Sequence, residues 1–345
     1  MRSQIERTAD RQFVLTLRRR WADTLYPALG KQYREQSEET GSALPDAAIR
    51  ELPAYPWFSW LERGSQKMLW RAVTDSVRAA APVQPDAQAE SLLELDDGLE
   101  LPTWYTDWDI HVQPGGVWSS DEAAAVYEAG AKLVMLGEND DYGFHRLFVS
   151  TALPERDYRR IVDLGCGFGK STWPMKEAFA DAEVIGIDLA APCLKLAASK
   201  ARERGLEVCF RQANAMATGL DTESVDLVTS TMLVHEMPVP ALEELFVEAS
   251  RILAPGGILR FLDFRFTGDS LRDMAMREHG ARNNEPFLAP AMEADLAAMA
   301  ERAGLLNARW SAFDERGEGM LSELAWPDRA EWHFPWAVLE AEKAR

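Results

Sequence analysis

Residues 161–171 read Ile-Val-Asp-Leu-Gly-Cys-Gly-Phe-Gly-Lys-Ser, and this stretch decides the fold. A short apolar run contains the acidic Asp163, three glycines follow at alternate positions, and a helical pattern comes next. Glycine allows the backbone to turn sharply and lets a ligand approach it closely. The stretch therefore predicts a strand, a tight turn that can contact a ligand, and a helix.

The spacing of the glycines argues against a dinucleotide-binding loop. A pyrophosphate-binding turn has the pattern Gly-x-Gly-x-x-Gly. Here Gly165, Gly167 and Gly169 alternate, and Lys170 follows directly. A nicotinamide-dependent dehydrogenase is therefore only a distant alternative.

Four further segments follow the glycine loop in an order that fits one sheet. Residues 183–188 form a β-branched run that ends in Asp188. A carboxylate at the end of the second strand of a βαβ unit can accept both hydroxyls of a nucleoside ribose. The other segments are a strand at 206–211 followed by 212–216, a strand at 225–231 followed by 232–237, and a helix, Pro-Gly-Gly turn and strand across 251–261.

Together, the Asp-Leu-Gly-Cys-Gly-x-Gly loop and these segments resemble the motifs of class I S-adenosylmethionine (SAM) dependent methyltransferases, over residues 142–313. The resemblance implies an α/β fold, with a Rossmann-like, doubly wound, mostly parallel sheet of seven strands and helices on both faces. It also implies SAM as the cofactor. It does not identify the substrate.

The same resemblance implies a set of cofactor-binding residues at the carboxyl ends of the strands, where ligands of open α/β sheets bind. The glycine loop would approach the methionine part of SAM, Asp163 would anchor its amino group directly or through water, and Asp188 would accept the ribose hydroxyls. The implied set is Asp163, Gly165, Cys166, Gly167, Gly169, Asp188, Leu189, Asn214, Ala215 and Thr231.

Four members of this set have more specific roles. Leu189 would pack on one face of the adenine, and Asn214 and Ala215 would meet its edge. Thr231 would face the methionine chain. Cys166 is either a reactive thiol in the loop or a small residue that fills a tight space.

His235 and Glu236 are the candidate catalytic residues. The stretch Leu-Val-His-Glu-Met-Pro at 233–238 resembles the segment that supplies a general base in many small-molecule O-methyltransferases. An imidazole titrates near neutral pH and can accept a phenol or carboxyl proton. The alternative is that His235 only packs or forms local hydrogen bonds. No His-Glu-x-x-His motif follows, so no metal site is expected, and no Gly-x-Ser-x-Gly elbow indicates a hydrolase.

Composition limits the partners and the compartment. The 345 residues carry a formal net charge of −19, which would repel nucleic-acid phosphates and anionic membranes. The acidity either serves solubility or attracts a cationic substrate. The sequence has no apolar run long enough to span a bilayer, no signal peptide at its start, and three cysteines without a CxxC pair. We expect a cytoplasmic protein with no nucleic-acid or membrane partner.

The chain divides into three parts. Residues 1–140 are expected to form a helical N-terminal region that covers the substrate, contributes to a homodimer, or both. Residues 141–325 would form the methyltransferase domain, and residues 326–345 a Trp-rich tail that packs on the body or on a second subunit. The aromatic segment 104–118 is either a structural corner or a lid hinged near Gly115 and Gly116.

Periodicity and breakers predict the elements within these parts. The expected helices cover the first 35 residues, about 57–80 with an end at Pro82 and Pro85, 121–136, 269–276 and 290–303; residues 278–286 would be a polar loop, and 308–313 and 319–325 the last, antiparallel pair of strands.

The sequence therefore predicts a SAM-dependent methyltransferase that modifies an oxygen, nitrogen or carbon of a small molecule, such as a secondary metabolite. One alternative is an enzyme that methylates protein side chains. The other is a non-catalytic SAM-binding or assembly protein.

Overall fold

The computed structural model describes residues 3–80, 89–137 and 139–345, and its centre is a sheet of nine strands. The strand order is β1-β4-β3-β2-β5-β6-β9-β7-β8. The strands are β1 (Leu93–Glu94), β2 (Arg160–Leu164), β3 (Glu183–Asp188), β4 (Cys209–Gln212), β5 (Val225–Thr231), β6 (Leu253–Phe264), β7 (Leu305–Asp314), β8 (Gly319–Met320) and β9 (Trp336–Lys343). The prediction of a mostly parallel, doubly wound sheet is confirmed, because β1 to β6 pair in parallel and only β9, β7 and β8 are antiparallel.

The sheet has two strands more than the seven expected. The additional strands are β1 and β9. Strand β1 has two residues, which is too short for an alternating pattern to reveal it, and β9 lies in the predicted tail. Strand β1 belongs to the N-terminal region and pairs with β4 at one edge, so that region contributes to the sheet as well as covering it.

Helices cover both faces of the sheet because successive residues of its central strands point to opposite sides. Ile161 packs in one core cluster with α7 (Gly143–Ala152), α8 (Thr172–Ala178) and α9 (Ala191–Glu203). Val162 packs in a second cluster with α10 (Val239–Ile252) and α13 (Leu296–Arg302). Such continuous apolar strands are typical of a parallel sheet that is buried on both faces.

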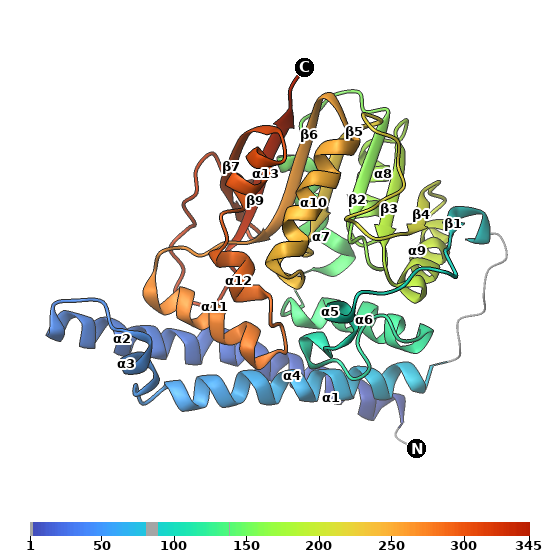
Figure 1. Ribbon diagram of the computed structural model, residues 1–345. Coiled ribbons are helices and arrows are strands. Elements are labelled where there is room, and N and C mark those ends of the chain that lie inside the picture. Colours follow the sequence, from blue (N-terminus) through green and yellow to red (C-terminus); the bar gives the residue numbers. More distant parts are fainter. Residues whose placement is uncertain (1–2, 81–88, 138) are drawn as a thin grey trace.

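The N-terminal helices form a layer below the carboxyl ends of the parallel strands (Figure 1). They are α1 (Gln4–Arg20), a π-helical turn (Trp21–Leu25), α2 (Tyr26–Thr40), α3 (Asp46–Arg50), α4 (Tyr55–Arg78), α5 (Thr103–Thr106) and α6 (Asp121–Val134). Helix α2 ends at Gly41, which has φ 69°, and the side chain of Ser120 caps α6, the helix expected at 121–136. The expected end of α4 at Pro82 and Pro85 lies outside the described residues.

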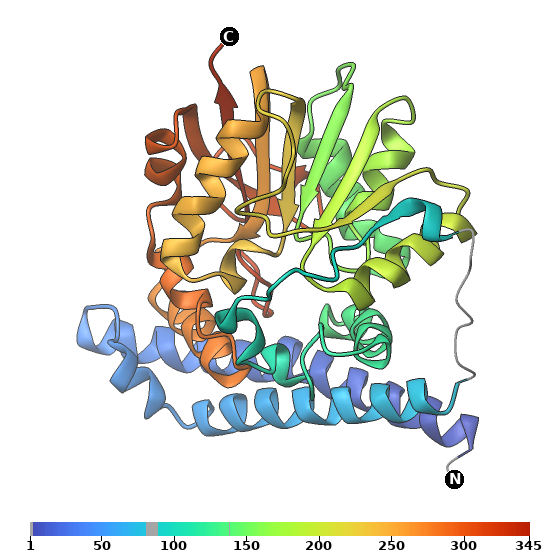
Figure 2. The same ribbon diagram turned by 45° about the vertical axis from the view of Figure 1, so that its right-hand side comes forward.

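Residues 95–120, which connect β1 to α6, run between the strand ends and helices α1 and α4. Figure 2 shows the coil before α6 between α1 and α4 below and the strand ends above, with α6 packed between α4 and α9. Residues far apart in the sequence therefore meet at this edge of the sheet.

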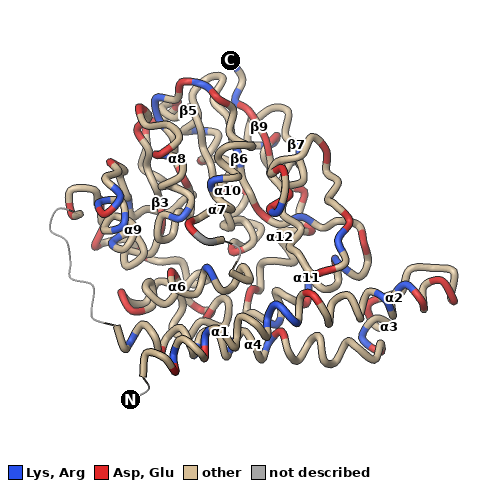
Figure 3. The backbone as a smooth tube through the Cα atoms, turned by 180° about the vertical axis from the view of Figure 1, so that it is seen from behind, with Lys and Arg blue, Asp and Glu red and all other residues tan. Residues whose placement is uncertain are grey.

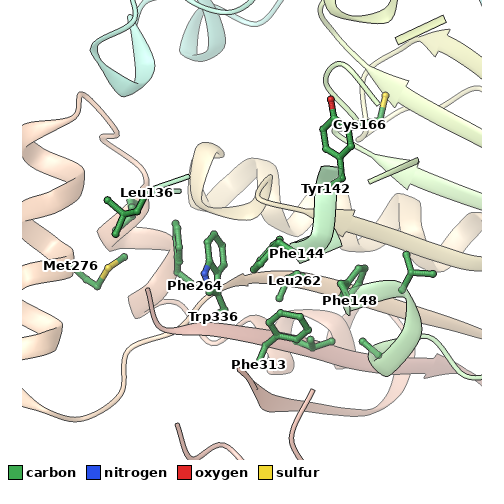
Figure 4. Packing of buried hydrophobic residues seen from close by; sticks show 14 of the residues in the cluster. Leu136, Tyr142, Phe144, Phe148, Cys166, Leu262, Phe264, Met276, Phe313 and Trp336 are labelled. Atoms are coloured by element: carbon green, nitrogen blue, oxygen red, sulfur yellow. The ribbon is translucent and has the colours of Figure 1, made fainter. Parts of the chain in front are cut away.

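The C-terminal boundary predicted at 325 is wrong. Strand β9 lies inside the last 20 residues and inserts between β6 and β7, so the tail is part of the sheet and the strand expected at 319–325 is reduced to β8. Trp332 and Trp336 are buried in their own chain. The ring of Trp336 stacks on Phe264 with centroids 4.2 Å apart (Figure 4).

The region between β6 and β7 also differs from the expectation. Helix α11 (Ser270–Arg282) continues into the expected polar loop. The expected helix at 290–303 is divided into α12 (Leu288–Glu293) and α13, because Asp295 caps a new helix start through the N–H of Ala298.

Acidic and basic positions are interspersed along the backbone (Figure 3). Among the described residues, no helix combines the length and the apolar character needed to cross a bilayer.

Candidate active site

The glycine loop follows β2 and needs glycine at two of its positions for steric reasons. Gly165 has φ 69°, and a Cβ there would lie 2.8 Å from Cδ1 of Leu233. Gly169 has φ 89°, and its Cβ would lie 2.7 Å from the Trp173 ring. The N–H groups of Gly165 and Cys166 donate to the carbonyl of Ile187, which ties the loop to the end of β3.

Asp188 ends β3 and holds the same loop from the other side. Its carboxylate accepts hydrogen bonds from the N–H of Gly167 at 2.8 Å and of Ala190 at 2.8 Å. Burial raises the pKa of Asp188, and the two N–H donors oppose that shift. Asp188 therefore fixes the glycine loop and also presents a carboxylate to the space next to it.

That space is a pocket at the carboxyl ends of β2, β3, β4 and β5, which we call the strand-end pocket. It contains about 770 Å³ of empty space, counting the part continuous with solvent. Six of the predicted cofactor residues line it, and the N-terminal region adds aromatic side chains. These residues are Gly165, Gly167, Asp188, Leu189, Asn214 and Ala215, with Trp104, Tyr105 and Tyr127.

Asn214 lines the strand-end pocket with one end of its amide already engaged. Its Oδ1 accepts a hydrogen bond from the N–H of Met216 at 3.0 Å. The Nδ2 group remains as its donor toward a ligand, which suits a purine ring nitrogen.

Four of the predicted cofactor residues lie outside the lining of this pocket: Asp163, Cys166, Gly169 and Thr231. Asp163 is fully buried, and its Oδ2 accepts from the hydroxyls of Ser171 at 2.6 Å and Thr172 at 2.7 Å. Burial raises the pKa of Asp163 to about 6. Asp163 thus supports the start of α8 from behind the loop, and its contact with a cofactor amino group stays a prediction.

The side chains of Cys166 and Thr231 are also buried behind the pocket. A Cβ at Gly186 would lie 2.9 Å from Sγ of Cys166, so the thiol fills a tight space against β3. Burial raises the pKa of Cys166 well above its ordinary value. This geometry favours the interpretation of Cys166 as a space-filling residue over that of a reactive thiol.

A second pocket lies beyond a wall that it shares with the first, and we call it the inner pocket. His111, Tyr127, Met232 and Glu236 line both pockets. The inner pocket contains about 740 Å³ of empty space, again counting the part open to solvent. Its other walls come from α4, from the residues after β6 and from the C-terminal tail, and include Trp70, Lys170, His235, Phe264, Glu285, Phe334 and Trp336.

A chain of alternating carboxylates and imidazoles runs along the inner pocket. Nδ1 of His235 lies 2.6 Å from Asp263, and its Nε2 lies 3.3 Å from Glu236. Glu236 in turn lies 3.4 Å from Nε2 of His111, whose Nδ1 lies 2.8 Å from Glu285. His111 and Glu236 are the members with the most open side chains, at 19% and 15% exposure, against 5% for His235.

The carboxylates of the inner pocket stabilise the protonated form of both imidazoles. Burial would lower the pKa of His235, but Asp263 and Glu236 outweigh it and hold that pKa well above its ordinary value. Burial would also lower the pKa of His111, and Glu285 and Glu236 raise it. Both nitrogens of His235 are therefore engaged in the protonated state at neutral pH. This arrangement favours the structural role that the sequence left open for His235, and its role as a base stays a prediction.

Two of the wall residues have a left-handed backbone. His111 has φ 58° and Met232 has φ 59°. Non-glycine residues adopt this conformation only when their surroundings enforce it, and such residues cluster at functional sites. The carbonyl of His111 accepts hydrogen bonds from Gln66 at 3.1 Å and Trp70 at 2.5 Å, so α4 holds the aromatic segment in place.

The site therefore contains residues that sequence reasoning missed. His111 was noted only as part of an aromatic segment, and Lys170 only because it interrupts the glycine spacing. Tyr127 is on the helix expected at 121–136, and Asp263 is near the end of a strand. Glu285 is in a stretch expected to be a polar loop. A carboxylate at the end of β6 was the one available signal, because ligands collect at strand ends.

Comparisons with known proteins agree with this geometry. Residues 161–257 match the family described as a methyltransferase domain. The chain is 37% identical over 143 residues to demethylmenaquinone methyltransferase of Thermus thermophilus, which covers 41% of this chain and 63% of that protein. It is 41% identical over 103 residues to geranyl diphosphate 2-C-methyltransferase of Saccharopolyspora erythraea. This match covers 28% of this chain and 34% of that protein.

A solved structure of phosphoethanolamine N-methyltransferase 2 from Haemonchus contortus is similar at 16% identity, with a TM-score of 0.47 and coverage of 66% of this chain and 58% of that one. The chain spans 63% and 34% of the length of the two curated relatives. Residues 161–257 of this chain are therefore similar to a methyltransferase domain, and the glycine loop and strand order agree with the resemblance to class I SAM-dependent methyltransferases.

Proposed function

We propose that the protein is an enzyme that transfers a methyl group from SAM to an oxygen, nitrogen or carbon atom of a small molecule. The observation that carries this proposal is the pair of pockets with a common wall. The strand-end pocket has the glycine loop and Asp188, and the inner pocket meets it at Tyr127, Met232 and Glu236. A donor in one pocket and an acceptor in the other would meet at that wall.

The residues of the strand-end pocket fit SAM. Gly165 and Gly167 line the pocket, Asp188 offers a carboxylate to a ribose diol, and Leu189 and Ala215 offer apolar surface to adenine. When bound there, SAM would supply a methyl group that is already activated by the adjacent sulfonium charge. The protein then has to position the acceptor, exclude water and accept a proton where the acceptor carries one.

The lining of the inner pocket supports a small acceptor. The aromatic side chains of Trp70, Phe264, Phe334 and Trp336 surround it beneath the N-terminal helices. Apolar walls with a few polar groups are typical of small-molecule sites. Methylation of a protein side chain would require a segment of the partner to enter between these aromatic walls, so this function is the second candidate.

Glu236 is the group best placed to meet a proton on the acceptor. It lies in the common wall and contacts both His235 and His111. Burial would raise the pKa of Glu236, but the two imidazoles outweigh it and lower that pKa. Glu236 would therefore orient an acceptor hydroxyl or amine as a hydrogen-bond acceptor, and a proton lost during transfer would enter the chain at this carboxylate.

The proposal is tested by calorimetric titration of the protein with SAM and with S-adenosylhomocysteine. We expect binding of both, and the absence of detectable heat at millimolar SAM would refute the proposed function. Incubation of the protein with methyl-labelled SAM and cell extract then separates the alternatives. Label in the small-molecule fraction supports the proposal, label in protein bands supports the second candidate, and binding without any transfer supports a non-catalytic SAM-binding protein.

We also propose that the N-terminal layer forms a homodimer through the outer side of α4. Trp57 and Trp60 are 65% and 68% exposed, and Met68 follows on the same side of the helix. Large exposed apolar stripes on a helix are typical of protein interfaces. Because a second copy exposes the same residues, the two stripes can pack against each other across a two-fold axis. The cytoplasmic location expected from the sequence stays a prediction.

A further inference from the structure

Lys170 is a buried ammonium group between the two pockets. It directly follows the glycine loop, it is 7% exposed, and its side chain lines the inner pocket. Its Nζ lies 3.3 Å from the hydroxyl of Tyr127 and 3.3 Å from Sδ of Met232. Both of these partners belong to the common wall, so Nζ lies where the two pockets meet.

Within the described part of the chain, Lys170 forms no ion pair with a carboxylate. The neighbouring charges that act on it at longer range are Glu236, Asp163 and Asp188. A phenol and a thioether compensate a desolvated ammonium group poorly. Arg282 shows the contrast, because this buried cation pairs directly with Glu62. Burial lowers the pKa of Lys170 to about 8, which is the response of a cation without a close counter-ion.

We propose that Lys170 is an anion-binding residue whose counter-ion is the carboxylate of a bound ligand. This inference rests on the proposed function. The carboxylate has two possible sources, namely the amino-acid end of the cofactor in the strand-end pocket or the acceptor in the inner pocket. Tyr127 would complete the site, because its hydroxyl accepts from Nζ and keeps its own hydrogen to donate to the ligand.

The chemistry of Tyr127 agrees with a donor role. Burial, together with the nearby Cys193, Glu236 and Asp188, raises the pKa of its hydroxyl, so the phenol stays protonated over the working range of pH. A carboxylate between Nζ and this hydroxyl would receive two hydrogen bonds, one of them charge-assisted.

The test compares ligands that differ in the carboxylate, with Lys170→Met as the variant. The nucleoside arm uses S-adenosylhomocysteine, which has the amino-acid end, and 5′-methylthioadenosine, which lacks it. The acceptor arm titrates benzoate into the protein saturated with S-adenosylhomocysteine. Lys195→Met, at an exposed position of α9, is the matched control for loss of a lysine charge.

The result identifies the source. If the carboxylate belongs to the cofactor, Lys170→Met weakens binding of S-adenosylhomocysteine about tenfold or more and leaves 5′-methylthioadenosine unchanged. If it belongs to the acceptor, both nucleosides keep their affinity and benzoate binding is lost. Lys170→Arg retains binding in either case. The proposal is overturned if Lys170→Met changes neither nucleoside nor benzoate affinity, or if it weakens binding of both nucleosides equally. It is also overturned if wild-type protein does not bind benzoate and Lys170→Met leaves the affinity for both nucleosides unchanged.

Failure of the proposed function can be distinguished from failure of the Lys170 proposal. If the protein does not bind SAM, neither nucleoside binds to the wild type, and titration with benzoate alone still tests Lys170. If Lys170→Met does not fold, the proposal can be tested on wild-type protein through proton uptake. Titration at pH 8 in buffers of different ionisation enthalpy would show proton uptake with S-adenosylhomocysteine or benzoate but not with 5′-methylthioadenosine. No difference in uptake among the three contradicts the proposal.

Discussion

The two pockets differ in how the chain builds them. The strand-end pocket consists of short loops that each follow a parallel strand, and its polar groups are fixed by backbone N–H donors, as with Asp188 and Gly167. The inner pocket is formed by α4, the aromatic segment, the loop after α11 and the C-terminal tail. Its polar groups are fixed by one another, in the chain from Asp263 to Glu285. The first pocket depends on local backbone geometry, and the second on charges that come from distant segments.

This difference predicts different responses to the loss of one charge. Removal of a carboxylate from the inner pocket leaves a buried cation without its partner, which is a strongly destabilising change. Removal of a carboxylate from the strand-end pocket leaves a less polar ligand site but no buried cation. The largest effect on stability is therefore expected in the inner pocket.

Asp263→Ala is the most disruptive single change of this kind. It removes the closest partner of His235 and an acceptor of the Val234 N–H. We expect a loss of about 3–5 kcal/mol in the free energy of unfolding, measured by urea denaturation with tryptophan fluorescence. Glu244→Ala, at an exposed position of α10, is the control and should change stability by less than about 0.5 kcal/mol. Equal effects of the two variants would show that the buried carboxylates and imidazoles of the inner pocket do not stabilise the fold.

Asp188→Ala tests the strand-end pocket. Loss of a hydrogen-bonded charged group is worth about 1.5–3 kcal/mol, so SAM affinity should fall by about one to two orders of magnitude in a calorimetric titration. Asp188→Asn keeps the shape and one acceptor, and an intermediate affinity is expected. Unchanged affinity in both variants would mean that this carboxylate only holds Gly167 and Ala190.

The strand-end pocket was largely predictable from the sequence, and the inner pocket was not. Gly165, Asp188 and Asn214 each follow a strand whose apolar run is visible locally, and the parallel order of the strands brings them together. His111 and Glu285 are 174 positions apart, and no local pattern links them. Strand β9 was missed for a related reason, because its insertion between β6 and β7 is a property of the sheet and not of the tail's own sequence.

The pH dependence of stability should separate the two kinds of buried cation. His235 has a raised pKa, so the folded state binds more protons, and its contribution is present below about pH 6.5 and lost as the pH rises through the folded-state value. Lys170 has a pKa lowered to about 8, so the unfolded state binds more protons between that value and about 10.4, and stability should rise with pH there.

The measurement is the free energy of unfolding from pH 6 to 10 for wild-type protein, His235→Gln and Lys170→Met. Relative to wild type, His235→Gln should lose the downward slope and Lys170→Met the upward slope. The difference curves matter because Asp163, whose pKa is about 6, titrates in the same experiment and is common to all three proteins. Parallel curves for all three would contradict both assignments.

The smallest effect on the fold is expected far from both pockets, on the outer side of α4. Trp57 and Trp60 expose most of their side chains, so Trp57→Gln combined with Trp60→Gln removes little buried surface, and the monomer should lose less than about 1 kcal/mol. If the homodimer forms through this stripe, light scattering after size exclusion should show half the mass of the wild type. SAM affinity should stay unchanged, because these positions contribute to neither pocket. Equal masses for variant and wild type would exclude this face of α4 as the interface. A fall in SAM affinity would instead show that a change on the outer side of α4 alters the strand-end pocket. The helical layer and the SAM site would then be coupled.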